Sequence, residues 1–290
     1  MRLRLSILLI VFSAAASMLW AQPHSISVGL RGGAGSYLAE GELKNCLAPN
    51  AMVDVGYTFL VPVGSSVELG IMTGVSLGYT GGSFFRKDLT EQYRNYDYLN
   101  HPIDYTCSTS LVKERINGFT MEIPAMFALR KSNGFVLNAG LKLQVPMWYR
   151  YHQDLTSPKV RAYYPEFRVD VTDELITGEI PTELNGTIGK RDIGDVSIIL
   201  GFELGYEWKL TDEDMLGLMG YLDGAPYSHP AGKRTEHVID VAPITNPSYP
   251  VPEVTVNTLV GTYATQLNYF DFGIKLYYRF DALRCLKKDN

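Results

Sequence analysis

The sequence predicts an all-β protein: a closed antiparallel transmembrane β-barrel of about eight strands, with long extracellular loops and short periplasmic turns. Eight segments alternate large apolar residues with small or polar ones, which is the period of a strand whose two faces differ. The chain also opens with an export signal. Short and long connections follow one another in turn, which is typical of bacterial outer-membrane barrels.

The export signal covers residues 1–21. Two arginines precede an apolar run from Leu5 to Leu19, and Ala21 stands just before Gln22, where we expect cleavage. An uncleaved anchor is the alternative, because the run approaches the length that spans a membrane. Small residues in the second half of the run and a proline after it favour cleavage. We therefore expect an exported mature chain that begins near Gln22.

The alternating segments form the predicted barrel domain, residues 22–280, and residues 281–290 follow it as a short periplasmic tail. Segment 214–222 is apolar on both parities, so its register stays open. An even strand number is usual for bacterial single-chain barrels. The expected strands are residues 25–34, 51–59, 66–79, 119–129, 135–147, 195–208, 214–222 and 268–280.

Connection lengths predict the orientation of the barrel. Three connections are short, near residues 62–64, 131–134 and 211–213. Because short turns face the periplasm and long loops face outside in such barrels, both chain ends should lie on the periplasmic side. Partial alternation in residues 160–171 and 253–263 suggests hairpins that extend above the membrane. The four long connections are residues 38–48, 81–117, 151–191 and 223–262.

A soluble sandwich or lipocalin-like barrel shows the same alternation, so the composition of the two faces decides between them. The apolar face of the strong strands carries no charge, and the other face is mostly Gly, Ser and Asn with isolated charges. A Lys or Arg facing lipid near the midplane would cost ~2–4 kcal/mol. We therefore expect the apolar face to contact lipid and the polar face to line the lumen.

The lumen of an eight-stranded barrel is only wide enough for side chains to fill it, so we expect no pore. Its charges should pair across the axis, and acid–base catalysis by the inward carboxylates is the less favoured alternative. Asp54 and Asp195 are further carboxylates on the inward parity. The expected lumen charge network comprises Arg31, Glu68, Glu122, Lys142, Glu203, Glu207, Asp271, Lys275 and Arg279.

Candidate catalytic and metal-binding residues are few. His152 is near Asp154 and His101 is near Asp104 in the sequence, a pairing that a surface hydrolase could use. Solvated loop histidines are the interpretation that we prefer. The remaining histidines lack metal-ligand spacing. We expect no catalytic residue, cofactor or metal site, and the net charge of −5 argues against a nucleic-acid partner.

The long loops hold two further sets of candidate residues. Cys46 and Cys107 fall in the first and second loops, where export permits a disulfide. Two free thiols are the open alternative, and Cys285 in the tail cannot reach either cysteine. Segment 81–117 is rich in tyrosine among Asp, Asn and Arg, a composition suited to partner binding; shielding of the barrel mouth is the alternative. The candidate binding residues are Tyr93, Tyr96, Tyr98 and Tyr105.

Several short motifs run through the predicted barrel domain. They are Val28 to Gly33, Met121 to Ala125, Asp192 to Gly194 leading into Gly201 to Glu207, and the closing strand that ends at Phe280. With these motifs the chain resembles the PorT-like outer-membrane β-barrel family of Gram-negative bacteria. The resemblance implies an eight-stranded barrel and a part in protein secretion across the outer membrane, and it brings no catalytic residues. The chain departs from the family pattern in its long loops and in residues 281–290 after the last strand.

These patterns predict a non-enzymatic protein in the outer membrane of a Gram-negative bacterium, acting through its extracellular loops as an interaction or structural component. An accessory subunit of an envelope complex is one form of this hypothesis. The expected partners are outer-membrane lipid and other envelope proteins or extracellular ligands. Two alternatives stay open: a PorT-like component of protein secretion, and a lipid or surface hydrolase.

Overall fold

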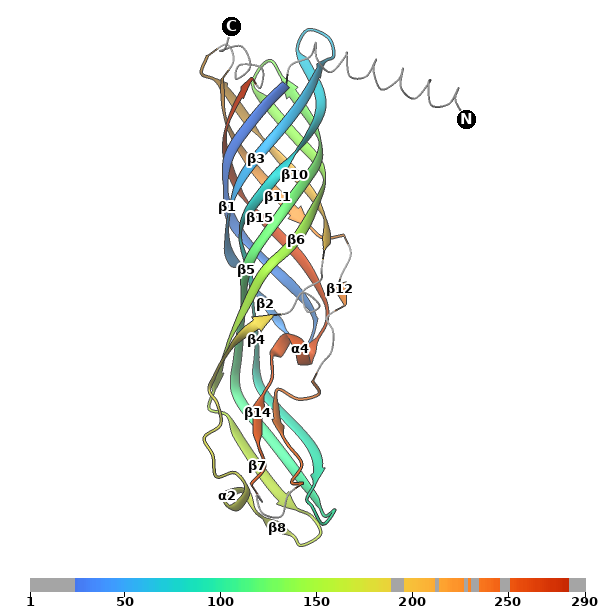
Figure 1. The fold of residues 1–290 in the computed structure, drawn as a ribbon, viewed down its shortest axis with the longest axis vertical. Coiled ribbons are helices and arrows are strands. Elements are labelled where there is room, and N and C mark those ends of the chain that lie inside the picture. The colour runs from blue at the N-terminus through green and yellow to red at the C-terminus, as the bar shows by residue number, and fades with distance from the viewer. Residues whose placement is uncertain are drawn as a thin grey trace, which may run out of the picture.

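A computed structural model describes residues 24–188, 196–211, 214–226, 229–230, 235–245 and 251–281. These residues form a long antiparallel barrel that continues at one end into an extended structure (Figure 1). The predicted export signal, most of the predicted tail with Cys285, and the Asp192 to Gly194 motif lie outside the described residues.

Eight strands close the barrel, as the sequence predicts. Each strand pairs with its neighbours along the barrel, and the first strand pairs with the last, from Ser25 opposite Asp281 to Gly41 opposite Ala264. The barrel strands are β1 (His24–Gly41), β3 (Ala48–Pro62), β4 (Val67–Tyr96), β5 (Pro102–Lys131), β6 (Phe135–Thr156), β10 (Ser197–Lys209), β11 (Met215–Gly224) and β15 (Ala264–Asp281).

The apolar parity of these strands faces outward, which confirms a transmembrane barrel. Leu30 is 63% exposed, whereas the next residue, Arg31, is 3% exposed. The same contrast separates Ile274 from Lys275 on β15. It also fixes the open register of β11, because Leu218 faces out and Met219 faces in. Lipid-exposed aliphatic side chains and inward charges are the reverse of a soluble barrel.

Tight turns close one end of the barrel at the three predicted places. The Val63 amide donates to the Val67 carbonyl at 2.7 Å, and the Gly134 amide donates to the Lys131 carbonyl at 2.9 Å. Gly64 and Gly134 have φ angles of 82° and 93°, a backbone region that glycine enters without steric cost.

The predicted loop 81–117 is instead a β-hairpin, and this expectation is wrong. β4 and β5 are each 30 residues long and remain paired from Val67 opposite Lys131 to Tyr96 opposite Pro102. A strand of that length reaches roughly 100 Å, whereas about 10 residues cross a bilayer. The hairpin therefore projects far beyond the apolar band.

We call the extended structure the head, defined as the described residues of 83–116, 149–188 and 225–263. Residues 160–171 form the expected hairpin, whereas 253–263 contribute a strand and a helical turn. Its elements are β7 (Lys159–Tyr164), β8 (Val169–Asp170), α2 (Thr172–Leu175), β9 (Glu183–Ile188), β12 (His229–Pro230), β13 (Ile239–Val241), β14 (Val254–Val256) and α4 (Leu259–Tyr263), with β2 (Lys44–Cys46) pairing β4 at its base.

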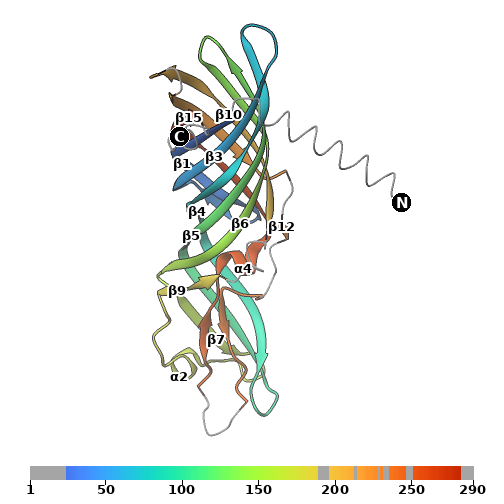
Figure 2. The same ribbon diagram turned by 45° about the horizontal axis from the view of Figure 1, so that its top comes forward.

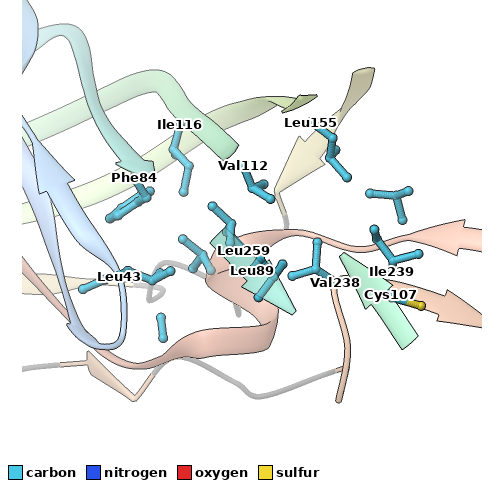
Figure 3. Packing of buried hydrophobic residues seen from close by; sticks show 14 of the residues in the cluster. Leu43, Phe84, Leu89, Cys107, Val112, Ile116, Leu155, Val238, Ile239 and Leu259 are labelled. Carbon is cyan, nitrogen blue, oxygen red and sulfur yellow. The ribbon is translucent and has the colours of Figure 1, made fainter. Parts of the chain in front are cut away.

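The head has a hydrophobic core of its own. Inward side chains of β4 and β5, such as Phe84 and Ile116, pack with the segment that carries Val238, Ile239 and Leu259 (Figure 3). All five side chains are fully buried. Figure 2 shows β4, β5 and β6 running without a break from the barrel into the head. Within the described residues, every helix falls short of the length and apolar character that crossing a membrane would need.

Candidate functional site

Arg31 is the centre of the charge network in the lumen. Its guanidinium contacts the Glu122 carboxylate and the Asp223 carboxylate, the latter at 2.8 Å. Asp54 lies 3.9 Å from its Nε. The Gln144 amide donates to Glu122 at 3.3 Å. All these groups are buried, and a buried charge needs such partners because its desolvation is costly.

Two lysines extend this network along the axis. Lys142 Nζ lies 2.9 Å from Asp223 and 3.3 Å from Glu203. Lys275 Nζ lies 3.4 Å from Asp54 and 3.5 Å from the same Glu203 oxygen. Opposite charges therefore alternate across the lumen, and neighbouring pairs share carboxylates.

A second cluster lies near the tight turns. Glu207 accepts hydrogen bonds from Arg279 at 2.7 Å and from Tyr277 at 2.7 Å, and Arg130 lies 3.4 Å away. The predicted Glu68 is half-buried in the same mouth of the barrel, where it lines a cavity with Arg130 and Arg279. Charged side chains thus line this mouth of the barrel and pair with one another there.

The predicted Asp271 lies near the charged groups around Arg31, and its carboxylate is bound by hydroxyl groups and an amide. It accepts hydrogen bonds from Tyr269 at 2.9 Å, from Tyr221 at 3.3 Å and from Asn50. Further toward the head, Tyr149 shares hydrogen bonds with Tyr37 at 2.6 Å and with Thr80 at 2.7 Å. These buried hydroxyl groups cover the network on the side of the head.

Sequence reasoning missed two members of the network, Arg130 and Asp223. Arg130 follows the predicted strand 119–129 by one residue, and Asp223 follows the predicted strand 214–222 by one residue. Both continue the inward parity of their strands, and both are buried. Extending the alternation of 119–129 by one residue would have found Arg130, whereas the open register of 214–222 assigned Asp223 to neither face.

Glu91 connects the hairpin of the head to the segment between β11 and β15. Its buried carboxylate accepts hydrogen bonds from the backbone amides of Val238, at 3.0 Å, and Ile239, at 3.2 Å. The Tyr263 hydroxyl donates to the same carboxylate. One side chain therefore satisfies three donors of a connection that has little regular structure.

Glu114 performs a similar role at the start of α4. The Leu259 amide donates to Glu114 Oε2 at 2.5 Å and also lies 3.0 Å from Gln153 Oε1. Burial raises the pKa of Glu114 from 4.5 to about 7. Its other oxygen has no hydrogen-bond partner among the described residues.

The four candidate binding tyrosines divide between two faces of the hairpin. Tyr105 is 1% exposed, and Tyr93 stacks on His237 with ring centroids 4.1 Å apart. The Tyr93 hydroxyl accepts a hydrogen bond from the Val241 amide at 2.7 Å. These two tyrosines build the core of the head, while Tyr96 and Tyr98 are 48% exposed near its tip.

Cys46 and Cys107 are free cysteines, so the expected disulfide is not formed. In the strand register, Cys46 lies opposite Ser83 of β4, and Cys107 lies opposite Glu91, farther along the same strand. The two positions on β4 are roughly 27 Å apart, since a strand rises about 3.4 Å per residue. A disulfide needs Cα atoms within about 7 Å. The unexpected length of the hairpin carries Cys107 out of reach.

The histidines that could serve a hydrolase contact carboxylates and an amide. His101 Nδ1 lies 2.7 Å from Glu166, and Asp104 pairs with Arg94, so the expected proximity of His101 to Asp104 makes no dyad. His152 Nε2 lies 3.1 Å from Asp154, as expected, and its Nδ1 lies 2.7 Å from the Asn185 amide oxygen. In the described part of the chain, no three His, Cys, Asp or Glu residues form a metal-binding group.

Comparison with known proteins finds similar solved structures at low sequence identity. No protein-family model and no curated protein matches it, so the PorT-like resemblance is not confirmed. It is similar to Ail of Yersinia pestis, crystallised with the heparin analogue sucrose octasulfate, with 7% identity, 89% and 99% of the two chains covered, and a TM-score of 0.32. It is also similar to Neisserial surface protein A, with 9% identity, 88% of this chain and 96% of that chain covered, and a TM-score of 0.27.

A third similar structure is the translocator domain of the autotransporter NalP from Neisseria meningitidis. The identity is 10%, the coverage is 96% of this chain and 95% of that chain, and the TM-score is 0.25. At these values, the fold assignment depends on the strand pairing and the exposed apolar face of this chain.

Proposed function

We propose that this chain is a non-enzymatic outer-membrane protein of a Gram-negative bacterium that acts through its head as an extracellular interaction component. The observation that carries the proposal is the head itself, a folded extension with its own core beyond the apolar band. A loop that only shields the barrel mouth needs no paired strands of this length. It also needs no buried carboxylates that bind backbone amides, as Glu91 and Glu114 do. A rigid surface held away from the membrane is suited to contact with a partner.

The lumen supports a role other than transport. Arg31, Glu122, Lys142 and Glu203 are each at most 3% exposed and are paired with one another or with neighbouring carboxylates. Eight strands leave room for filling side chains and little else. The surface of the head is therefore the part of the chain available for interaction.

The two alternatives receive less support. His101 and His152 contact carboxylates and an amide in exposed positions, whereas a hydrolase needs a histidine beside a nucleophile. A part in secretion, or in a larger envelope complex, would follow from the PorT-like resemblance and has no separate structural observation in its favour.

Replacement of the head tests the proposal. In the truncated variant, short turns join Gly82 to Ile116, Arg150 to Val196 and Gly224 to Ala264, which leaves the barrel pairing intact. The full chain in lipid nanodiscs should bind epithelial cells, bacterial cells or envelope extract, and the truncated variant should bind none of them. Biolayer interferometry and cell-bound fluorescence measure the binding.

The Ser65→Ala variant, changed in a turn at the other end of the barrel, is the control and should bind like the full chain. Equal binding by the truncated variant would contradict the proposal. Turnover of a lipid or peptide substrate by the full chain, lost in His152→Ala, would favour the hydrolase instead.

A further inference from the structure

The outer face of the head carries a polar groove across three strands, β4, β5 and β7. The strand registers arrange six side chains in two rows. One row is Arg94, Asp104 and Tyr163, and the other is Gln92, Thr106 and Arg161. Tyr105 and Ala162, which point to the other face, are buried in the core of the head. The groove therefore has a rigid floor, and its volume is about 720 Å³.

The charges in this groove are already compensated. The Arg94 guanidinium makes two bonds to Asp104, from Nε at 2.6 Å and from Nη2 at 3.0 Å. Arg161 Nε donates to Asp170 at 2.7 Å, and Asp170 also accepts from the Thr172 hydroxyl at 2.6 Å. Because each arginine is paired with one carboxylate, the four charges sum to zero, so the groove offers an anion no net attraction and favours an uncharged ligand.

The remaining groups suit a ligand that is rich in hydroxyl groups. The Gln92 amide and the Thr106 hydroxyl each present a donor and an acceptor, and the fixed Arg94–Asp104 pair adds planar donors beside acceptors. The half-buried Tyr163 ring adds an apolar surface with a polar tip. Adjacent sugar hydroxyls, each both donor and acceptor, match this pattern, and sugar C–H faces pack on aromatic rings.

A peptide fits the groove less well. Extended peptides commonly add a strand to an open sheet edge, but the central strand of the groove floor has no open edge. β5 in particular is paired with β4 on one side and with β7 on the other. Recognition must then come from side chains alone, and these are mostly polar.

We infer that this groove binds an uncharged oligosaccharide, two to four sugar units long in view of its volume, which is within the ~300–1,000 Å³ of small-ligand sites. This inference rests on the proposed function and names the ligand class of the head. The ion pairs hold Arg94 and Arg161 in place before the ligand arrives, which reduces the entropy lost on binding.

A glycan array tests the inference with the detergent-purified full chain. The array carries neutral oligosaccharides, including cellotriose, maltotriose and chitotriose, together with sulfated and uronic-acid glycans and a set of peptides. At least one neutral oligosaccharide should bind, and calorimetry should show Gln92→Ala and Tyr163→Ala each weakening its Kd by at least tenfold. The controls Arg115→Ala and Phe167→Ala, exposed on the head outside the groove, should change Kd less than twofold.

Several results would overturn the inference. These are no binding of any neutral glycan, binding of charged glycans or peptides only, or groove variants that bind as tightly as the full chain. If the head replacement abolishes cell binding while no neutral glycan binds, the proposed function stands and the groove inference fails. If the head replacement has no effect on cell binding, the proposed function fails by its own test.

Discussion

Glu114 is a carboxylate placed in the core of the head against backbone amides and the Gln153 side chain. Burial and the nearby Glu114 carboxylate together raise the pKa of the half-buried Tyr151. The backbone amides of Leu259 and Val260 favour the charged form of Glu114, and burial opposes that form more strongly. Ionisation of Glu114 therefore destabilises the folded head, although the same carboxyl group binds the Leu259 amide at the start of α4.

The first prediction concerns the pH dependence of the head. The pKa of Glu114 is about 7 in the folded head against an ordinary 4.5. Between these values the folded state holds a proton that the unfolded state releases, so the free energy of unfolding of the head should fall as pH rises from 4.5 to 7. The loss should be on the order of 3 kcal/mol and should level off above pH 7.

Glu114→Gln keeps an acceptor for the Leu259 amide and cannot ionise, so it should remove this dependence. Hydrogen exchange of residues 235–245 and 251–263, corrected for intrinsic rates from pH 5 to 8, measures the effect. The exposed Glu183→Gln is the matched control and should leave the wild-type pH profile unchanged. An identical profile in wild type and Glu114→Gln would refute the prediction.

At the scale of elements, the hairpin of β4 and β5 changes its inward parity once. On β4 the inward residues have even numbers before Asp88, as at Phe84, and odd numbers after it, as at Leu89. On β5 the inward residues have odd numbers up to Cys107 and even numbers from Val112 onward. Asp88 and Ser110 are left out of the pairing, between Lys87 opposite Leu111 and Leu89 opposite Thr109. The extra residue on each strand keeps apolar side chains on one side of the sheet.

The second prediction tests this irregularity. Asp88 has a φ of 50°, which asparagine, aspartate and glycine tolerate and β-branched residues do not. Asp88→Val should lower the stability of the hairpin by about 1–2 kcal/mol, and Asp88→Gly should change it by less than about 0.5 kcal/mol. Hydrogen exchange of residues 84–112 reports the change.

Thr90→Val, an exposed β-branched substitution two residues away, is the control and should have little effect. If Asp88→Val were as stable as Thr90→Val, the positive φ would not matter to the hairpin.

The same irregularity explains which elements the sequence predicted and which it did not. A strict period of two identifies seven of the eight barrel strands, because lipid on one side and a lumen lined by polar side chains on the other require it over the whole span; segment 214–222 is apolar on both parities. The apolar residues Ile103, Tyr105 and Cys107 alternate just as clearly, but on the odd parity, whereas Val112 and Ile116 follow the even one. Because the inward parity changes at Ser110, the alternation of β5 does not continue as a single period of two, and the sequence predicted a loop there instead of a strand.

The partners of individual residues depend on contacts that periodicity does not contain. Alternation placed the lumen charges on the inward face but did not pair them, because pairing depends on shear between distant strands. The sequence predicted Tyr93 and Tyr105 to be surface residues. In the structure, the change of parity at Asp88 and Ser110 directs both side chains into the core of the head. The described residues of 235–263 cover them; this segment alternates only in part, and hydrogen bonds to Glu91 and Glu114 hold it in place.

At the scale of the whole molecule, the buried network connects strands that are far apart in sequence. Arg31 on β1 joins Glu122 on β5 and Asp223 on β11. These three strands are well separated around the barrel, so one guanidinium fixes their relative positions. Such networks specify a unique arrangement, while the loss of one partner leaves a buried charge without compensation.

The third prediction removes that guanidinium. Arg31→Met retains most of the side-chain volume and should destabilise the barrel by about 3–5 kcal/mol, because Glu122 loses its cationic partner. Urea titration in lipid vesicles, followed by the gel mobility of folded barrels, measures the loss. Arg31→Met/Glu122→Gln should recover part of it, and the exposed Arg115→Met should show none. Wild-type stability in Arg31→Met would mean that the network is dispensable.

The unbroken course of β4 and β5 has a mechanical consequence. From Gly82 to Tyr96 the hairpin extends roughly 48 Å at about 3.4 Å per residue, so anything that touches the tip is held about that far from the lipid. Tension applied at the tip travels along the same two strands into the wall of the barrel, parallel to the strands. Because both strands are pulled in the same direction, the load falls on the ladders that join β4 to β3 and β5 to β6. Their backbone hydrogen bonds are then sheared together instead of opened one by one, so a tether attached at the tip would resist pulling with many bonds at once.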